Sequence, residues 1–145
     1  DYELEFLAKM ERRSVAWFIR AADFENYYRV RISRSEQDPN ALELTRYAVL
    51  GGVAEEPVTV PLRVAVRSKA AFRVLTTAAA DSFTVAVEGE VVDTWSDGRL
   101  GAGGIGFEAE QDDRARLYWV KLTPRGRQSQ PAASRGIAPR RKQRR

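Results

Sequence analysis

The sequence predicts an all-β protein with the architecture of a sandwich or barrel, and two observations carry this prediction. Apolar and polar side chains alternate along several segments, and a period of two is that of a half-buried strand. Turn signals rich in glycine, proline and aspartate separate these segments at near-regular intervals. No segment of useful length has the helical period, and about nine or ten short strands in a 145-residue chain are typical of one sandwich or barrel domain.

Five strands are predicted in the first half of the chain. The opening segment alternates, whereas the run SVAWFIRA is continuously apolar and is expected to be covered on both sides. After a turn at 23–26, alternation places Tyr28 and Val30 inward and Arg29 outward. Pro61 removes a ladder donor from the last of these strands, which therefore belongs at a sheet edge or across a bend. The predicted strands are Tyr2–Met10, Ser14–Ala21, Tyr27–Ser33, Leu42–Val49 and Val58–Val66.

Five further strands are predicted in the second half. We expect a tight hairpin turn at Gly89, because glycine readily takes the positive φ that such turns require. The glycine-rich stretch 96–103 is expected to be a loop, since no phosphate-loop lysine follows it. The predicted strands are Ala71–Thr77, Ser82–Glu88, Val91–Trp95, Gly104–Glu110 and Ala115–Leu122.

Charge is unevenly divided along the chain. The full sequence has 24 Lys and Arg against 20 Asp and Glu, a net charge of +4. Residues 125–145 hold 8 of the basic residues and no acidic one, which leaves 16 basic and 20 acidic residues, a net charge of −4, for the rest. The C-terminal stretch is also too poor in large apolar residues to offset the entropy of ordering it. We therefore expect one domain over residues 1–123 and a disordered basic tail over residues 124–145.

Cysteine and histidine are both absent from the sequence. Their absence excludes thiol and imidazole nucleophiles, Ser-His-Asp and Cys-His arrangements, and zinc sites with the usual ligands. A self-sufficient enzyme is therefore the less favoured interpretation, and a binding or accessory module is favoured.

Four segments carry a resemblance to a known superfamily. They are Asp1–Phe6; Trp17–Ala21 with Asp23 and Asn26–Tyr28; Phe83–Trp95; and Gly104–Phe107 with Ala115–Val120. In order and spacing they resemble the concanavalin A-like lectin/glucanase superfamily, especially its laminin-G-like and bacterial 3-keto-disaccharide hydrolase-type domains. The resemblance spans residues 1–123 and implies a jelly-roll sandwich of two antiparallel sheets. Members usually have a further strand ahead of the acidic opening strand, pairing with the last strand, so we expect this domain to lack its first strand.

The resemblance also implies that a saccharide or glycoconjugate binds on the concave face of one sheet. Aromatic side chains stack on sugar faces, and arginine hydrogen-bonds hydroxyls or carboxylates with fixed geometry. The candidate ligand-binding residues are Arg20, Tyr27, Arg29, Arg46, Tyr47 and Trp95. The three arginines lie in different strands and would form a basic stripe if one face carried them all. The alternative is cross-strand pairing with Glu3, Glu5 or Glu43. Trp17 and Trp119, in continuous apolar runs, are expected in the core.

The leading hypothesis is a lectin-like binding module, accessory to a larger or secreted bacterial protein in an extracellular or periplasmic location. One alternative is a 3-keto-glycoside hydrolase or lyase domain, but the Glu-x-Asp-x-x-Glu signature of the related glucanases is absent, and Glu88, Glu90 and Asp93 straddle a turn. The other is a structural or protein-interaction sandwich whose exposed edge strand pairs with a partner or with a second copy.

Weaker hypotheses concern ions and polyanions. Asp112 with Asp113, or Asp93 with Asp97, would supply the oxygen ligands of a calcium site, and otherwise no cofactor is expected. The basic cluster at the end of the tail would contact a polyanion by charge alone, the alternative being a flexible solubilising terminus. This cluster comprises Arg140, Arg141, Lys142, Arg144 and Arg145. No apolar run approaches the roughly 18 residues of a membrane helix.

Overall fold

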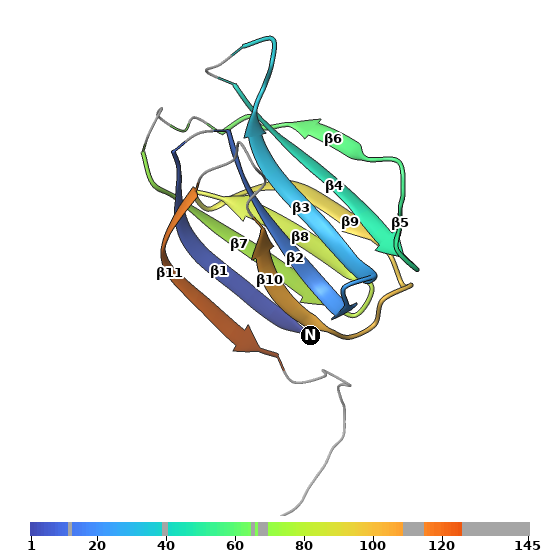
Figure 1. The fold of residues 1–145 in the computed structure, drawn as a ribbon. Coiled ribbons are helices and arrows are strands. Elements are labelled where there is room, and N and C mark those ends of the chain that lie inside the picture. The colour runs from blue at the N-terminus through green and yellow to red at the C-terminus, as the bar shows by residue number, and fades with distance from the viewer. Residues whose placement is uncertain (12, 39–40, 65, 67–69, 109–114, 126–145) are drawn as a thin grey trace, which may run out of the picture.

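The computed structural model describes residues 1–11, 13–38, 41–64, 66, 70–108 and 115–125. The regular secondary structure assigned among these residues is all β-strand. The strands form two antiparallel sheets, stacked as two layers (Figure 1). The prediction of an all-β sandwich is therefore confirmed. Most of the predicted tail lies outside the described residues, and its disorder stays a prediction.

Sheet A has five strands in the order β11-β1-β7-β8-β9, and sheet B has six, in the order β10-β2-β3-β4-β5 with β6 also paired to β4. Sheet A consists of β1 (Tyr2–Met10), β7 (Phe72–Ala79), β8 (Ser82–Val87), β9 (Glu90–Ser96) and β11 (Ala115–Pro124). Sheet B consists of β2 (Ser14–Asp23), β3 (Asn26–Arg34), β4 (Leu42–Leu50), β5 (Val53–Ala54), β6 (Val58–Pro61) and β10 (Gly104–Glu108).

The core lies between the sheets, and β1 contributes every second side chain to it. Burial alternates along the whole strand as the sequence pattern predicts, with Tyr2, Leu4, Phe6, Ala8 and Met10 buried. Because β1 is paired with β7 on one side and with β11 on the other, it is an interior strand of sheet A.

Trp17 of β2 is fully buried and connects the two layers. Its ring packs edge-to-face on Phe6, with 5.1 Å between the ring centroids. Its Nε1 donates a hydrogen bond of 3.0 Å to Oγ1 of Thr76 on β7, so two buried polar groups satisfy each other. The prediction that Trp17 belongs to the core is confirmed.

The layers are matched strand by strand except at one edge. The ring pair Phe6–Phe107 places β10 against β1, and the ring pair Tyr28–Phe83 places β3 against β8. Sheet B ends at β10 among the described residues, whereas sheet A continues beyond β1 to β11 (Figure 1). Sheet A therefore extends further than sheet B on this side.

This offset leaves β11 exposed along its whole length. Leu117, Val120 and Leu122 are paired with buried residues of β1 and share their inner face, yet they remain 37–48% exposed. The expectation that Trp119 lies in the core is wrong, because its side chain is 41% exposed. The opening strand pairs directly with the last strand, and the existence of a further strand ahead of β1 stays a prediction.

Most other elements lie where the sequence predicts them. Gly89 has a φ of +82° in the turn between β8 and β9. The expected strand Val58–Val66 is limited to Val58–Pro61, at the edge of sheet B beside β4. Residues 109 and 110, the end of the predicted strand Gly104–Glu110, lie outside the described residues. In the part of the chain that the structure describes, no helix has the length and apolarity to cross a membrane.

The two tryptophans give a direct test of this packing. Trp17→Ala should lower the free energy of unfolding by about 3–5 kcal/mol, because it empties a core site and leaves Thr76 without its donor. Trp119→Ala should cost roughly 1 kcal/mol or less. Chemical denaturation of both variants measures the difference, and equal losses would contradict the exposed position of β11.

Candidate functional site

The outer face of sheet B, which points away from sheet A, carries a row of aromatic and charged side chains. Tyr28 and Val30 are buried inward, as predicted, so the intervening Arg29 points outward. Arg29 is paired in register with Phe18 on β2 and with Tyr47 on β4. Directly paired residues of neighbouring strands share a face, so these three side chains lie side by side.

Arg29 is held in place by a carboxylate from the edge of the same sheet. Its Nε and Nη2 lie 2.7 and 2.6 Å from Oε1 of Glu108 on β10. The guanidinium also lies 5.6 Å from the ring centroid of Tyr47. Arg29 is only 5% exposed, and a charge so covered needs a partner of this kind. The pair therefore fixes a cation and a carboxylate in one orientation.

A hollow of about 520 Å³ opens beside this pair, between β10, β2 and the β2–β3 turn. Its lining includes Phe18, Tyr27, Phe24, Gly106 and Glu108. The rings of Phe18 and Tyr27 meet edge-to-face with 4.8 Å between centroids. Gly106 of β10 is paired with Phe18 of β2. A Cβ at Gly106 would lie 3.3 Å from Cδ2 of Phe18, so the absence of a side chain there leaves space beside the Phe18 ring. Burial raises the pKa of Tyr27, so its hydroxyl remains a neutral donor and acceptor near pH 7.

Arg46 and Trp95 lie elsewhere, between the sheets at the opposite side of the sandwich. Nε of Arg46 lies 2.6 Å from Oδ2 of Asp93 on β9, and its guanidinium lies 4.6 Å from the ring centroid of Trp95. Trp95 in turn stacks on Phe83 at 5.4 Å. Tyr47 is shared, because it borders both this region and the outer face.

Arg20 lies in a third place, buried at one end of the sandwich. Its backbone N–H donates to the hydroxyl of Tyr2 at 2.8 Å, and its guanidinium lies 5.3 Å from the ring centroid of Phe83. The expectation that the three arginines form one stripe is therefore wrong, since only Arg29 faces outward. Their acidic partners are Asp1, Glu108 and Asp93 rather than Glu3, Glu5 or Glu43.

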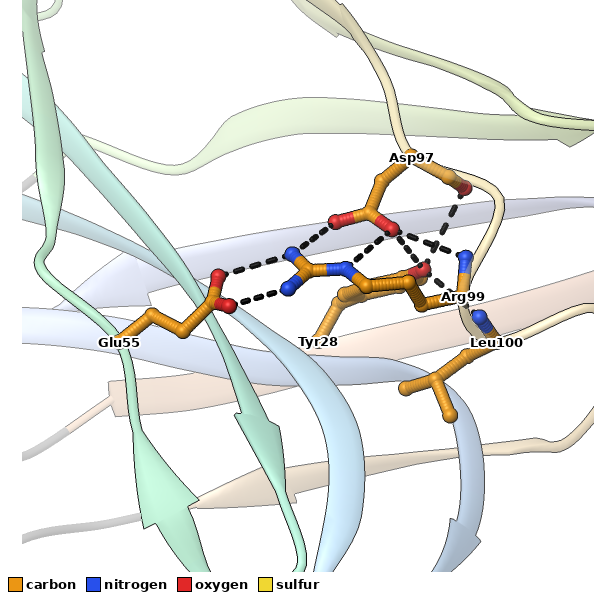
Figure 2. Close-up of polar contacts among 5 residues, drawn as sticks. All are labelled: Tyr28, Glu55, Asp97, Arg99 and Leu100. Atoms are coloured by element: carbon orange, nitrogen blue, oxygen red, sulfur yellow. Dashed lines mark hydrogen bonds and ion pairs between the residues drawn. The ribbon is translucent and has the colours of Figure 1, made fainter.

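A polar network closes the sandwich near β5 (Figure 2). Arg99 bridges the carboxylates of Asp97 and Glu55, with Nη2 at 2.6 Å from Asp97 Oδ2 and 2.8 Å from Glu55 Oε1. The hydroxyl of Tyr28 donates to Asp97 Oδ1 at 2.8 Å and accepts from the backbone N–H of Leu100 at 2.9 Å. These contacts anchor the 97–100 segment to β3.

The network shifts the pKa values of two of its members. Hydrogen bonds from the Arg99 side chain lower the pKa of Asp97 to about 2. Burial, followed by the hydrogen bond to Asp97, raises the pKa of Tyr28 to about 12. Both groups therefore keep their charge states over the whole physiological range.

The carboxylates considered for calcium or catalysis are used in other contacts. Asp93 and Asp97 are engaged with arginines, and Glu88 accepts the backbone N–H of Arg73 at 2.8 Å. Among the described residues, no group of three acidic side chains is arranged to hold a metal ion. Asp112 and Asp113 lie outside the described residues, and a calcium site there stays a prediction.

No protein-family model and no curated protein matches the sequence. The structure is similar to the carbohydrate-binding module CBM66 from Bacillus subtilis, with a TM-score of 0.67 and 16% identity over 86% of this chain and 75% of that one. The fold is a concanavalin A-like jelly-roll β-sandwich. Sheep galectin-11 in complex with glycerol gives a TM-score of 0.63 with 11% identity, over 83% of this chain and 88% of that one. Galectin-Ib of Xenopus laevis gives a TM-score of 0.64 with 14% identity, over 83% of this chain and 89% of that one. The laminin-G-like or keto-disaccharide hydrolase type stays a prediction.

Among the described lining residues of the hollow, only Tyr27 was a sequence candidate, and the residues missed include Phe18, Phe24 and Glu108. Phe18 sits in the apolar run that was expected to be covered on both sides. The sequence does not indicate a site role for Glu108, because its partner Arg29 is 79 positions away in the sequence. Phe24 did carry a signal, since it is a large apolar residue inside the polar turn DFEN.

The network around Asp97 predicts a pH effect on stability. The folded-state pKa of about 2 lies below the unfolded value of 3.8, so Asp97 stabilises the fold above pH 4, and this contribution is lost as the pH falls toward 2. Asp97→Asn should lower the free energy of unfolding at pH 6 and flatten its decline between pH 4 and 2. Urea denaturation at several pH values measures this. Glu56→Gln, an exposed acid beside the same network, is the control, and an unchanged slope for Asp97→Asn would contradict the assignment.

Proposed function

We propose that this protein binds a saccharide or glycoconjugate on the outer face of sheet B, in the hollow beside Arg29 and Glu108. The observation that carries the proposal is the juxtaposition of the aromatic rings of Phe18 and Tyr27 with a fixed arginine–carboxylate pair. The hollow of about 520 Å³ lies within the roughly 300–1,000 Å³ of typical small-molecule sites.

The chemistry of the hollow suits a ring that has both an apolar face and hydroxyl groups. Tyr27 offers a partly exposed ring for stacking, and its neutral hydroxyl both donates and accepts hydrogen bonds. Glu108 lines the hollow and accepts hydrogen bonds from ligand hydroxyls. Because Arg29 already holds this carboxylate in place, little side-chain entropy remains to be lost on binding.

The fold similarity is consistent with this proposal, since CBM66 is named as a carbohydrate-binding module. We further propose that the domain acts as an accessory module of a larger or secreted bacterial protein, in an extracellular or periplasmic location. Contact of the terminal basic cluster with a polyanion stays a separate prediction about residues outside the described ones.

A matched pair of tyrosine variants tests the site. Tyr27→Ala should weaken binding of any glycan that the wild-type protein retains on a glycan array by about 3- to 10-fold, as expected when one stacking ring is removed. Tyr118→Ala removes an exposed ring from β11 that is not among the described lining residues of the hollow, and it should leave affinity unchanged. Calorimetric titration measures both. Absence of any saturable glycan binding by the wild-type protein would refute the proposed function.

The exposed edge favours a second candidate function, self-association through β11. The strand is ten residues long, has no partner on its outer side among the described residues, and exposes five large apolar side chains. Unpaired backbone groups along such an edge are a template for another strand. Antiparallel pairing of β11 with β11 of a second copy would satisfy these groups and cover part of the apolar surface.

Hydrodynamic measurement tests the second function. Light scattering coupled to size-exclusion chromatography should show a dimer whose fraction rises with concentration, and Leu122→Lys should shift it to monomer. Val91→Lys places the same charge at an exposed apolar position of β9, at the opposite edge of sheet A, and should leave the dimer intact. A monomer at every concentration would rule out this role for the edge.

A further inference from the structure

We infer that the hollow beside the β2–β3 turn selects uncharged saccharides over carboxylated and sulfated ones, and that Phe24 forms its ring-stacking wall. This inference rests on the proposed function and names the ligand class of the same site. It depends on two observations, the rigid presentation of an exposed aromatic ring and the sign of the charges in the lining.

Phe24 is 98% exposed at the tip of the β2–β3 turn, and it lines the hollow. An apolar side chain so exposed contributes little to folding, and a ring at the border of a hollow is suited to contact a ligand. Because nothing in the core depends on this ring, it can be removed without disturbing the sandwich.

The turn that carries Phe24 is fixed on both sides. Oδ1 of Asp23 accepts the backbone N–H of Glu25 at 2.8 Å and the side-chain amide of Asn26 at 3.0 Å. Oδ1 of Asn26 accepts the N–H of Gly51 at 2.9 Å, which ties the turn to the end of β4. The backbone that carries Phe24 is therefore ordered in the absence of a ligand, which reduces the entropy cost of binding.

The charged groups among the described lining residues of the hollow are both carboxylates. They are Asp23 and Glu108, and no Lys or Arg belongs to the part of the lining that the structure describes. The hydrogen bonds to Asp23 lower its pKa, which keeps it charged at neutral pH. The nearest cation, Arg29, is already paired with Glu108. A carboxylate or sulfate placed in the hollow would therefore meet repulsion with no compensating cation, whereas hydroxyls find acceptors.

The other end of the same face has the opposite character. A hollow of about 240 Å³ there is lined by Arg13, Arg31 and Arg34, together with Ser33, Glu36 and Glu43. Arg31 lies four residues from Tyr27 on β3, which is about 13 Å along a strand. This exceeds the Debye length of about 8 Å at physiological salt, so the arginines do not offset the acidic character at Phe24. An anionic glycan would be drawn to the basic end instead.

A matched set of glycans tests the inference. Uncharged oligosaccharides that the protein binds are compared with the same oligosaccharides carrying a C6 carboxylate or a sulfate ester, and affinities are measured by calorimetry at low and physiological salt. We expect the charged forms to bind in the hollow at least about 10-fold more weakly at physiological salt, where the arginines of the basic end are screened. At low salt the Debye length of about 30 Å lets those arginines attract the charged forms as well, so the difference in affinity should be smaller there. Amide chemical-shift changes for the uncharged form should cluster around Phe24, Tyr27 and Glu108.

Three variants and one control separate the contributions of the ring and of the charge. Phe24→Ala should weaken binding by about 3- to 10-fold with unchanged unfolding, and Val91→Ala, an exposed apolar truncation on sheet A, is its control. Asp23→Asn keeps an oxygen acceptor for the turn but removes the charge. It should therefore reduce the difference in affinity between the uncharged and the anionic forms of the glycan. Phe24→Leu tests whether the ring, rather than apolar area alone, is needed.

The outcomes separate the inference from the proposed function. Equal or tighter binding of anionic glycans in the hollow beside Phe24, shift changes around Arg31 and Arg34 with the uncharged form, or an affinity for the uncharged form unaffected by Phe24→Ala would overturn the inference while leaving saccharide binding intact. Failure of every glycan, charged or uncharged, to bind would overturn both.

Discussion

The buried guanidinium of Arg20 is the constraint on which the rest of the structure depends. Its Nη1 and Nη2 each donate at 3.0 Å, to the carbonyl oxygens of Leu100 and Ala80, and Nη2 lies 3.3 Å from the carboxylate of Asp1. Covered charges are tolerated only where such partners exist, so β2, the N-terminal residue, the β7–β8 turn and the loop before β10 are fixed together. Gly103 completes the arrangement, because a Cβ there would lie 2.5 Å from the carbonyl carbon of Arg20. The position of β10, and with it one wall of the hollow, follows from this junction.

The fold could be predicted because its signals are local. Alternation along β1 and the turn at Gly89 are properties of a few neighbouring residues, and both lie where the sequence places them. The wrong predictions concern the burial and the contacts of individual side chains, which depend on segments distant in the sequence. Trp119 lies in an apolar run, as Trp17 does, but its register partner Leu7 lies on the outer face of β1, so the side chain of Trp119 points away from sheet B.

The candidate site was predicted only in part for the same reason. Tyr27, Arg29 and Tyr47 follow from strand periodicity and cross-strand register, and they do share the outer face. Arg46 falls on the inner face of its strand, where Asp93 and Trp95 meet it, and the bulge beside Arg20 turns that residue into the sandwich. The bulge beside Arg20 is not visible in a period of two, because it interrupts the pattern without changing composition. Alternation does place Arg46 inward with Leu42 and Leu44, but its partner Asp93 lies 47 positions away in the sequence.

The position of β1 between β7 and β11 has a consequence for how the chain acquires its binding surface. The β2–β3 and β3–β4 pairings join neighbours in sequence and can form as soon as these strands exist, whereas sheet A needs the last strand to pair with the first. Closing so long a loop is slow relative to forming a hairpin. Arg29 takes its partner Glu108 from a position 79 residues along the chain. The hollow is complete only where β10 is paired with β2, so its geometry depends on the second half of the chain as well as on the first.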